Sequence, residues 1–154
     1  MSPKDQNARL LVTLYSIKLI EGHVGKMSKA YDFLKGCKRI FVAAVSDGAP
    51  SSKPFDAVME YMGELYFTTA VDRRLITHQP VQIIAGKDGS NDWIRVGGSV
   101  VEVFDVDAKL AMLESYPFLT EHYGSRGYQH LALFKFREVK ALLHTGNGVI
   151  ELDS

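Results

Sequence analysis

The sequence has a single cysteine, Cys37, among its 154 residues, so no disulfide can form within the chain. No group of cysteines and histidines has the spacing of a zinc site, and we expect no metal centre. No apolar run approaches the roughly 20 residues that a membrane-spanning helix needs. The first residues also lack the charged segment and apolar core of a signal peptide. These absences lead us to expect a protein of the reducing cytoplasm that does not act at a membrane.

An excess of charge of either sign is also missing. The 18 basic residues balance the 18 acidic ones, so no global field favours nucleic acid or an anionic lipid surface as a partner. Apolar residues make up 46% of the chain, which is ordinary for a globular protein. We therefore expect one domain over residues 1–154, with residues 1–25 as an N-terminal helical extension.

Apolar spacing predicts the order of the elements. Periods typical of helices occur over residues 10–20 and 27–34, and a glycine follows each of them. Short apolar or alternating segments then predict strands, with a turn at 47–50, a helix capped by Asp105 and a short helical piece after Pro117. The predicted strands are 40–45, 55–61, 65–69, 81–85, 93–104, 131–136 and 139–144. Gly97 and Gly98 fall inside a strand and indicate a bulge, a barrel corner or a close backbone approach. This order favours a mainly antiparallel barrel with a few helices.

The most informative chemistry follows the strand at 65–69. That strand ends in the hydroxyls of Thr68 and Thr69, and Arg73 and Arg74 come a few residues later at the start of a predicted helix. Hydroxyls, free N–H groups at a helix N-terminus and guanidinium groups together suit a phosphate. From the residues alone, a solvated turn in which Asp72 pairs with an arginine is the competing interpretation. We identify no catalytic triad or acid–base pair, and the catalytic residues stay unknown.

Four segments, in order along the chain, resemble the pyridoxamine 5′-phosphate oxidase-like family. Residues 27–35 (MSKAYDFLK) resemble the helix before its first barrel strand, and residues 52–58 (SKPFDAV) resemble its Arg-Pro-Phe segment. Residues 63–69 (GELYFTT) and 93–98 (WIRVGG) resemble two of its barrel strands. Each segment is weak alone, but the four occur in the family's order, and the resemblance runs over about residues 27–146, most of the chain.

This resemblance implies an α+β fold, a six-stranded antiparallel Greek-key split β-barrel with flanking helices. It also implies a homodimer that binds FMN in a groove between its subunits. Carried over position by position, the residues that contact FMN are Lys53, Pro54, Phe55, Thr68, Thr69, Arg73, Arg74 and Trp93. The arginine pair would hold the phosphate, and Trp93 would approach the partner's flavin. Lys53 replaces the family's commoner arginine, so it would meet an anion as a point charge. His78 and Gln79 are weaker candidates, since the segment after the basic pair is shorter than in the oxidase.

The resemblance favours an FMN-dependent oxidoreductase, with NADH or NADPH as a candidate electron donor and a small molecule as acceptor. A flavin-binding electron carrier without catalytic activity and a haem-binding relative are the alternatives. We do not expect the chain to make pyridoxal phosphate, because residues 142–154 contain no arginine, lysine, tryptophan or proline. Arg126 and Arg137 lie upstream, and their spacing does not indicate a clamp for a substrate phosphate.

Overall fold

The computed structural model describes residues 27–55, 57–68, 79–123 and 131–153. The predicted helix over residues 10–20 lies outside this part of the chain. A helix over residues 27–35 comes first. The elements that follow are β1 (Ile40–Ser46), β2 (Ala49–Phe55), β3 (Ala57–Tyr61), β4 (Glu64–Thr68), β5 (Pro80–Gly86), β6 (Trp93–Val103), α3 (Val106–Ser115), α4 (Pro117–Tyr123), β7 (Leu133–Thr145) and β8 (Gly148–Leu152).

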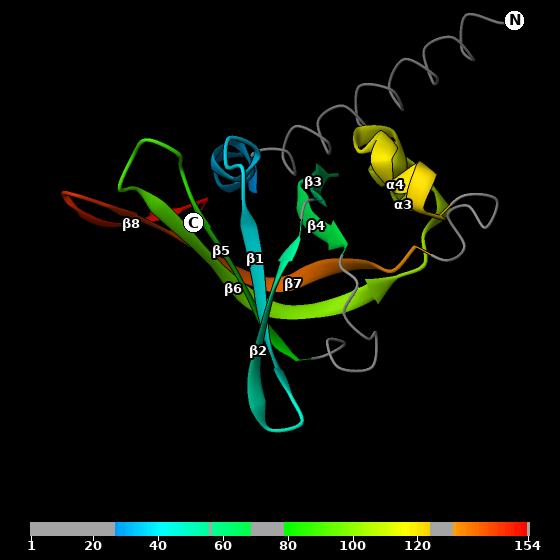
Figure 1. Ribbon diagram of the computed structural model, residues 1–154, viewed down its shortest axis with the longest axis horizontal. Helices are drawn as coiled ribbons and strands as arrows, with labels where there is room; N and C mark the ends of the chain where they lie inside the picture. Colours follow the sequence, from blue (N-terminus) through cyan, green and yellow to red (C-terminus); the bar gives the residue numbers. More distant parts are fainter. Residues whose placement is uncertain (1–26, 56, 69–78, 124–130, 154) are drawn as a thin grey trace, which may run out of the picture.

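The eight strands form one antiparallel sheet in the order β2-β1-β5-β6-β7-β4-β3, with β8 paired to β7. The two ends of this order, β2 and β3, are consecutive in the chain and separated by a single residue. The sheet therefore curls round so that its first and last strands meet, as Figure 1 shows. This confirms the predicted mainly antiparallel barrel architecture, although with more strands than the six expected.

The inner face of the curled sheet encloses the main core. The helix at 27–35 contributes Met27, Ala30 and Leu34, which are buried against strand residues. Phe67 of β4 lies in this core, and its ring is 5.5–5.6 Å from those of Phe55, Phe134 and Phe136. Burial of each large apolar side chain contributes about 1.5–3 kcal/mol, so this cluster is the main source of stability.

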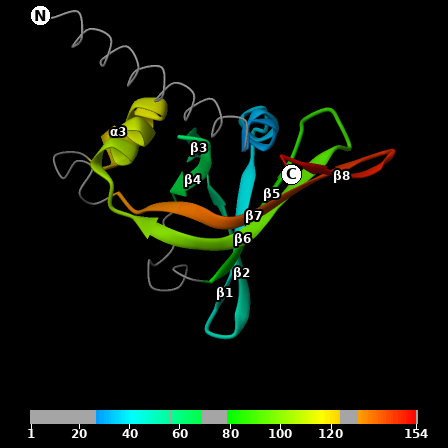
Figure 2. The same cartoon turned by 180° about the vertical axis from the view of Figure 1, so that it is seen from behind.

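A second cluster covers one end of the outer face. Helix α3 packs Ala108 and Met112 against Met59 and Tyr66 of β3 and β4. Asp105 caps this helix, as predicted, because its carboxylate accepts a hydrogen bond from the Ala108 amide at 2.9 Å. Figures 1 and 2 show α3 at one end of the long β6–β7 ribbon and β8 at the other, so the outer face between them is not covered by a helix of the described chain.

Three strand assignments differ from the sequence analysis. β2 was not predicted, because Pro50 and Pro54 interrupt a polar segment; it pairs only with β1, and an edge strand tolerates the missing amide donors. The two strands predicted at 131–136 and 139–144 are one strand, β7, which is bulged rather than broken. β8 was not predicted either, and four of its five residues are exposed.

Candidate functional site

The predicted residues of β2 divide between the core and the surface. Phe55 is buried and contacts Phe67, so it acts as a core residue. Lys53 lies on the same face of β2 as Phe55 and pairs with Val42 of β1, but its side chain is exposed to solvent. Pro54 is exposed on the other face. Of these three, only Lys53 presents a charged group that can meet an anionic ligand.

Thr68 ends β4 and is buried. Its hydroxyl donates a hydrogen bond to the Ala132 carbonyl at 2.7 Å, and its backbone pairs with Ala57 and Leu133. The hydroxyl proton is therefore already used within the protein, and the side chain fixes the point at which β4 ends. Thr69, Arg73, Arg74 and His78 follow in the sequence and lie outside the described residues, so their assignment to a phosphate site stays a prediction.

Trp93 begins β6 and forms an aromatic stack on the outer face. Its ring is 3.8 Å from the ring of His144, the residue opposite it on β7, and the two planes differ by 9°. The guanidinium carbon of Arg95 is 5.3 Å from the centre of the indole. The Arg95 Nε and His144 Nε2 atoms are buried, and neither has a hydrogen-bond partner among the described residues. Because unpartnered buried polar atoms are costly, they mark a place where a ligand or another chain can bind.

The other flank of Trp93 is open on the β5 side. Its partner there is Gly86, which is exposed, and a side chain added at this glycine would meet no atom within 4 Å. His144 therefore stacks on the indole, the Arg95 guanidinium also lies over the ring, and the neighbouring strand β5 contributes no side chain to it. We call Trp93, Arg95, His144 and Gly86 the Trp93 ledge. A planar ligand with hydrogen-bonding edges suits such a surface.

Most of the pKa values that depart from normal among the described residues do so because of burial. Burial, together with smaller contributions from the nearby carboxylates of Glu64 and Asp105, raises the pKa of Tyr66 to about 12. Burial likewise raises the pKa of Glu60 and of the Cys37 thiol. Within the described ranges, no group of three or more ligating side chains could hold a metal ion, and no helix there is long and apolar enough to cross a membrane.

Sequence reasoning identified Trp93 but missed Arg95 and His144. The alternation Trp-x-Arg within a strand was a usable signal, since residues two apart share one face. His144 lies 51 positions further along the chain, and only the register of β6 on β7 brings it beside Trp93.

Comparison with solved structures identifies the fold. A NimC/NimA family protein from Clostridium acetobutylicum superposes with a TM-score of 0.72 at 24% identity, over 82% of this chain and 91% of that one. A second protein from the same organism, related to general stress protein 26 of Bacillus subtilis and placed in the pyridoxinephosphate oxidase family, gives 0.56 at 14% identity, over 82% and 92%. The chain has the split-barrel fold.

Other split-barrel proteins match at lower similarity. HutZ, the haem storage protein of Vibrio cholerae, superposes with a TM-score of 0.52 at 12% identity, over 74% of this chain and 92% of HutZ. No protein-family model and no curated protein matches the chain. The shared property is therefore the split barrel itself, and the ligand has to be argued from the residues of this chain.

Proposed function

We propose that this split-barrel protein is an FMN-dependent oxidoreductase that works as a homodimer, with the flavin between its subunits. The Trp93 ledge carries this proposal. It combines an indole to which the neighbouring strand β5 contributes no side chain with two buried nitrogens, Arg95 Nε and His144 Nε2, that are unpartnered within the described chain, on an open face of the sheet. An isoalloxazine ring is planar, and its edge carries both donors and acceptors.

The remaining contacts would come from the chain that follows β4. Thr68 fixes the end of that strand, so the segment with Thr69, Arg73 and Arg74 begins at a defined point of the barrel. We assign the FMN phosphate to those three residues, with Lys53 as an additional positive charge. When bound, FMN supplies the redox chemistry, and the protein contributes binding, orientation and electrostatics.

The test compares two ligands that differ only by the phosphate. Replacing both arginines (Arg73→Ala, Arg74→Ala) should weaken the binding of FMN far more than that of riboflavin, which lacks the phosphate. Charge-assisted hydrogen bonds to a phosphate contribute about 1.5–3 kcal/mol each. The matched control is Lys38→Ala with Arg39→Ala, another adjacent basic pair, which is exposed. Equal losses for FMN and riboflavin would show that the arginines do not bind the phosphate.

Exposed apolar side chains on the outer face support the homodimer. Phe41 and Val45 of β1 are 40% and 49% exposed, and the register places them on the face away from the main core. Obligate dimers commonly bury about 2,000 Å² or more, and apolar surface of this kind is what they cover. A flavin-loaded monomer in sedimentation at micromolar concentration would contradict this part of the proposal.

Haem binding is the second candidate, because the unpartnered Nε2 of His144 is an atom type that ligates haem iron. The absorption spectrum separates the two ligands, and a haem spectrum that His144→Ala abolishes would favour haem. If flavin binds, bleaching by NADH or NADPH at a useful rate would distinguish an enzyme from an electron carrier.

A further inference from the structure

The pairing of β6 with β7 is interrupted at one place. Ser99 pairs with Glu138, but the next residue of β6, Val100, pairs with Phe136. Arg137 is therefore an extra residue on β7 that has no partner in the register. This is a β-bulge, a feature that redirects side chains and is frequent beside binding sites.

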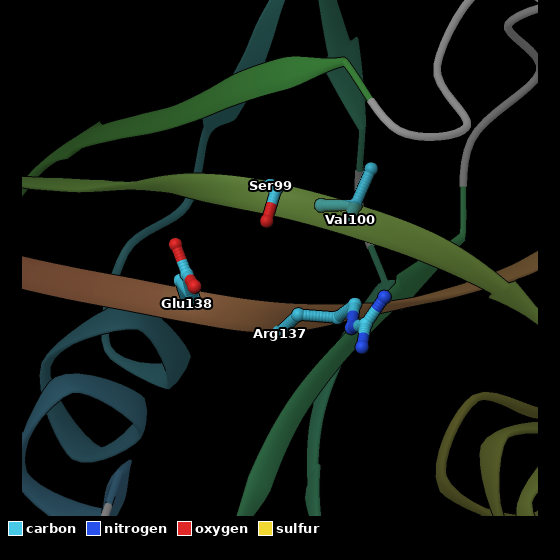
Figure 3. A pocket seen from close by; sticks show the side chains of 4 residues that line it. All are labelled: Ser99, Val100, Arg137 and Glu138. Carbon is cyan, nitrogen blue, oxygen red and sulfur yellow. The ribbon is translucent and has the colours of Figure 1, made fainter.

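The bulge brings two adjacent charged residues to one pocket. Successive side chains of a regular strand point to opposite faces, yet Arg137 and Glu138 both line a pocket of about 440 Å³, together with Ser99 and Val100. Phe136, just before them, is buried in the core. In the view of Figure 3 the Glu138 carboxylate and the Arg137 guanidinium lie on either side of the Ser99 hydroxyl.

Gly98 is part of the same local arrangement. A Cβ atom at this position would lie 1.7 Å from the Glu138 carbonyl oxygen and 2.8 Å from its carbonyl carbon. Only glycine allows β6 to approach β7 this closely. The extra residue on one strand and the glycine on the other thus set the backbone geometry beside the pocket.

Among the described residues, Arg137 and Glu138 lack the ion pairs that the neighbouring charged residues of β7 make. Lys135 pairs with Glu64 at 2.9 Å, and Lys140 lies 4.0 Å from Glu151. No ion pair within the described chain involves Arg137 or Glu138, although they are adjacent and of opposite charge. A guanidinium group and a carboxylate are therefore both available to a ligand.

We propose that this pocket binds a small amino carboxylate, with its carboxylate on Arg137 and its ammonium group on Glu138. The planar fork of an arginine matches a carboxylate in two parallel hydrogen bonds. Glu138 repels a ligand that is only an anion and attracts one that also carries a positive group. The volume lies within the range of small-molecule sites. The inference uses none of the residues assigned to FMN and stands apart from the proposed function.

The experiment titrates the full chain with 4-aminobutyrate, butyrate and butylamine by calorimetry. We expect 4-aminobutyrate to bind about twofold to fivefold more tightly than either single-charge analogue, because Arg137 and Glu138 are exposed and a solvent-exposed ion pair contributes about that factor. Arg137→Ala should weaken 4-aminobutyrate by a similar factor, and Arg137→Lys by less. Glu138→Gln should reduce the difference in affinity between 4-aminobutyrate and butyrate. Arg39→Ala and Glu114→Gln, at exposed positions elsewhere, should leave all three titrations unchanged.

Two results would overturn the proposal. One is no binding of 4-aminobutyrate, or equal binding of 4-aminobutyrate and butyrate, by the unmodified chain. The other is a Glu138→Gln variant that keeps the full preference for the amino carboxylate while its circular dichroism stays native. Because no flavin enters the assay, these outcomes are independent of whether FMN binds.

Discussion

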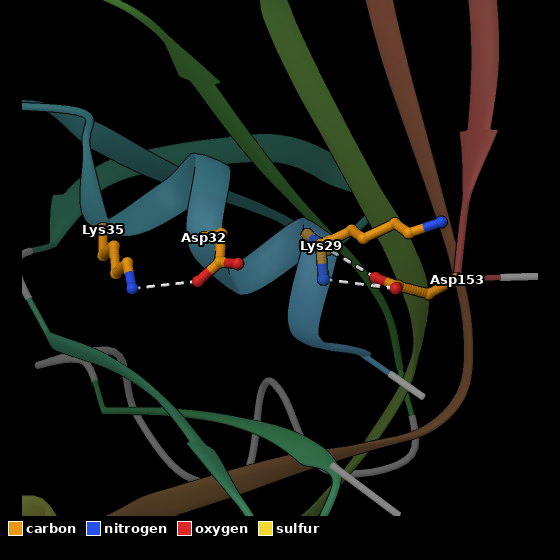
Figure 4. A network of polar contacts seen from close by, with 5 residues as sticks. Lys29, Asp32, Lys35 and Asp153 are labelled. Carbon is orange, nitrogen blue, oxygen red and sulfur yellow. Dashed lines mark hydrogen bonds and ion pairs between the residues drawn. The ribbon is translucent and has the colours of Figure 1, made fainter. Parts of the chain in front are cut away.

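The carboxylate of Asp153 connects the end of β8 to the first described turn of the helix at 27–35 (Figure 4). Its Oδ2 accepts a hydrogen bond from the Ala30 amide at 2.8 Å, and its Oδ1 accepts one from the Lys29 amide at 3.2 Å. Ala30 is fully buried in the main core. This contact therefore links the helix at 27–35, which packs into the main core, to a residue more than 120 positions away in the sequence.

Asp153→Ala removes both bonds and should lower the free energy of unfolding by about 1–2 kcal/mol, the cost of losing a helix cap. The midpoint of thermal unfolding should fall by about 3–6 °C. Asp153→Asn should cost less, because its amide oxygen still accepts one bond. Urea unfolding followed by circular dichroism at a fixed protein concentration measures the change.

The matched control is Asp32→Asn on the same helix. Asp32 pairs with Lys35 at 2.9 Å, but both side chains are more than half exposed, so this pair should contribute little. If Asp153→Ala destabilised the protein no more than Asp32→Asn, the reasoning about the cap would be refuted.

Three further predictions follow from the fold and from the composition of residues 142–154. Gly98→Ala should destabilise the protein by about 2 kcal/mol or more, since its Cβ would overlap the Glu138 carbonyl oxygen; unchanged urea unfolding would contradict this. The raised pKa of Tyr66, about 12, means that the folded state keeps a proton that the unfolded state loses, so stability should fall between pH 10 and 12; Tyr66→Phe should reduce that slope in urea titrations. Flavin-loaded protein should not oxidise pyridoxamine phosphate, and turnover of about 1 per second or faster would contradict the prediction.

Local patterns in the sequence predicted most of the barrel. Alternating residues in β3 and the tight turn into β4 indicated a hairpin, and Met62 and Gly63 have the positive φ angles that such turns require. Asp105 and its helix were likewise predicted, since a cap depends on neighbouring residues alone. These features are local, so a single segment contains the information.

The features that sequence reasoning missed depend on distant partners. The proline-containing β2 is a strand because β1 lies beside it. The stacking of His144 on Trp93 follows from the register of β6 on β7. Gly97 and Gly98 did indicate a bulge or a close backbone approach, but only this register places the extra residue at Arg137. No short segment carries that register, so the Trp93 ledge could not be assembled from motifs.

The most direct test of the central claim is the absorption spectrum of the full chain after incubation with FMN and removal of free ligand. We expect a bound-flavin spectrum at about one FMN per chain, which the Arg73→Ala, Arg74→Ala variant loses and the Lys38→Ala, Arg39→Ala control retains. A colourless protein, or a haem spectrum in its place, would contradict the account.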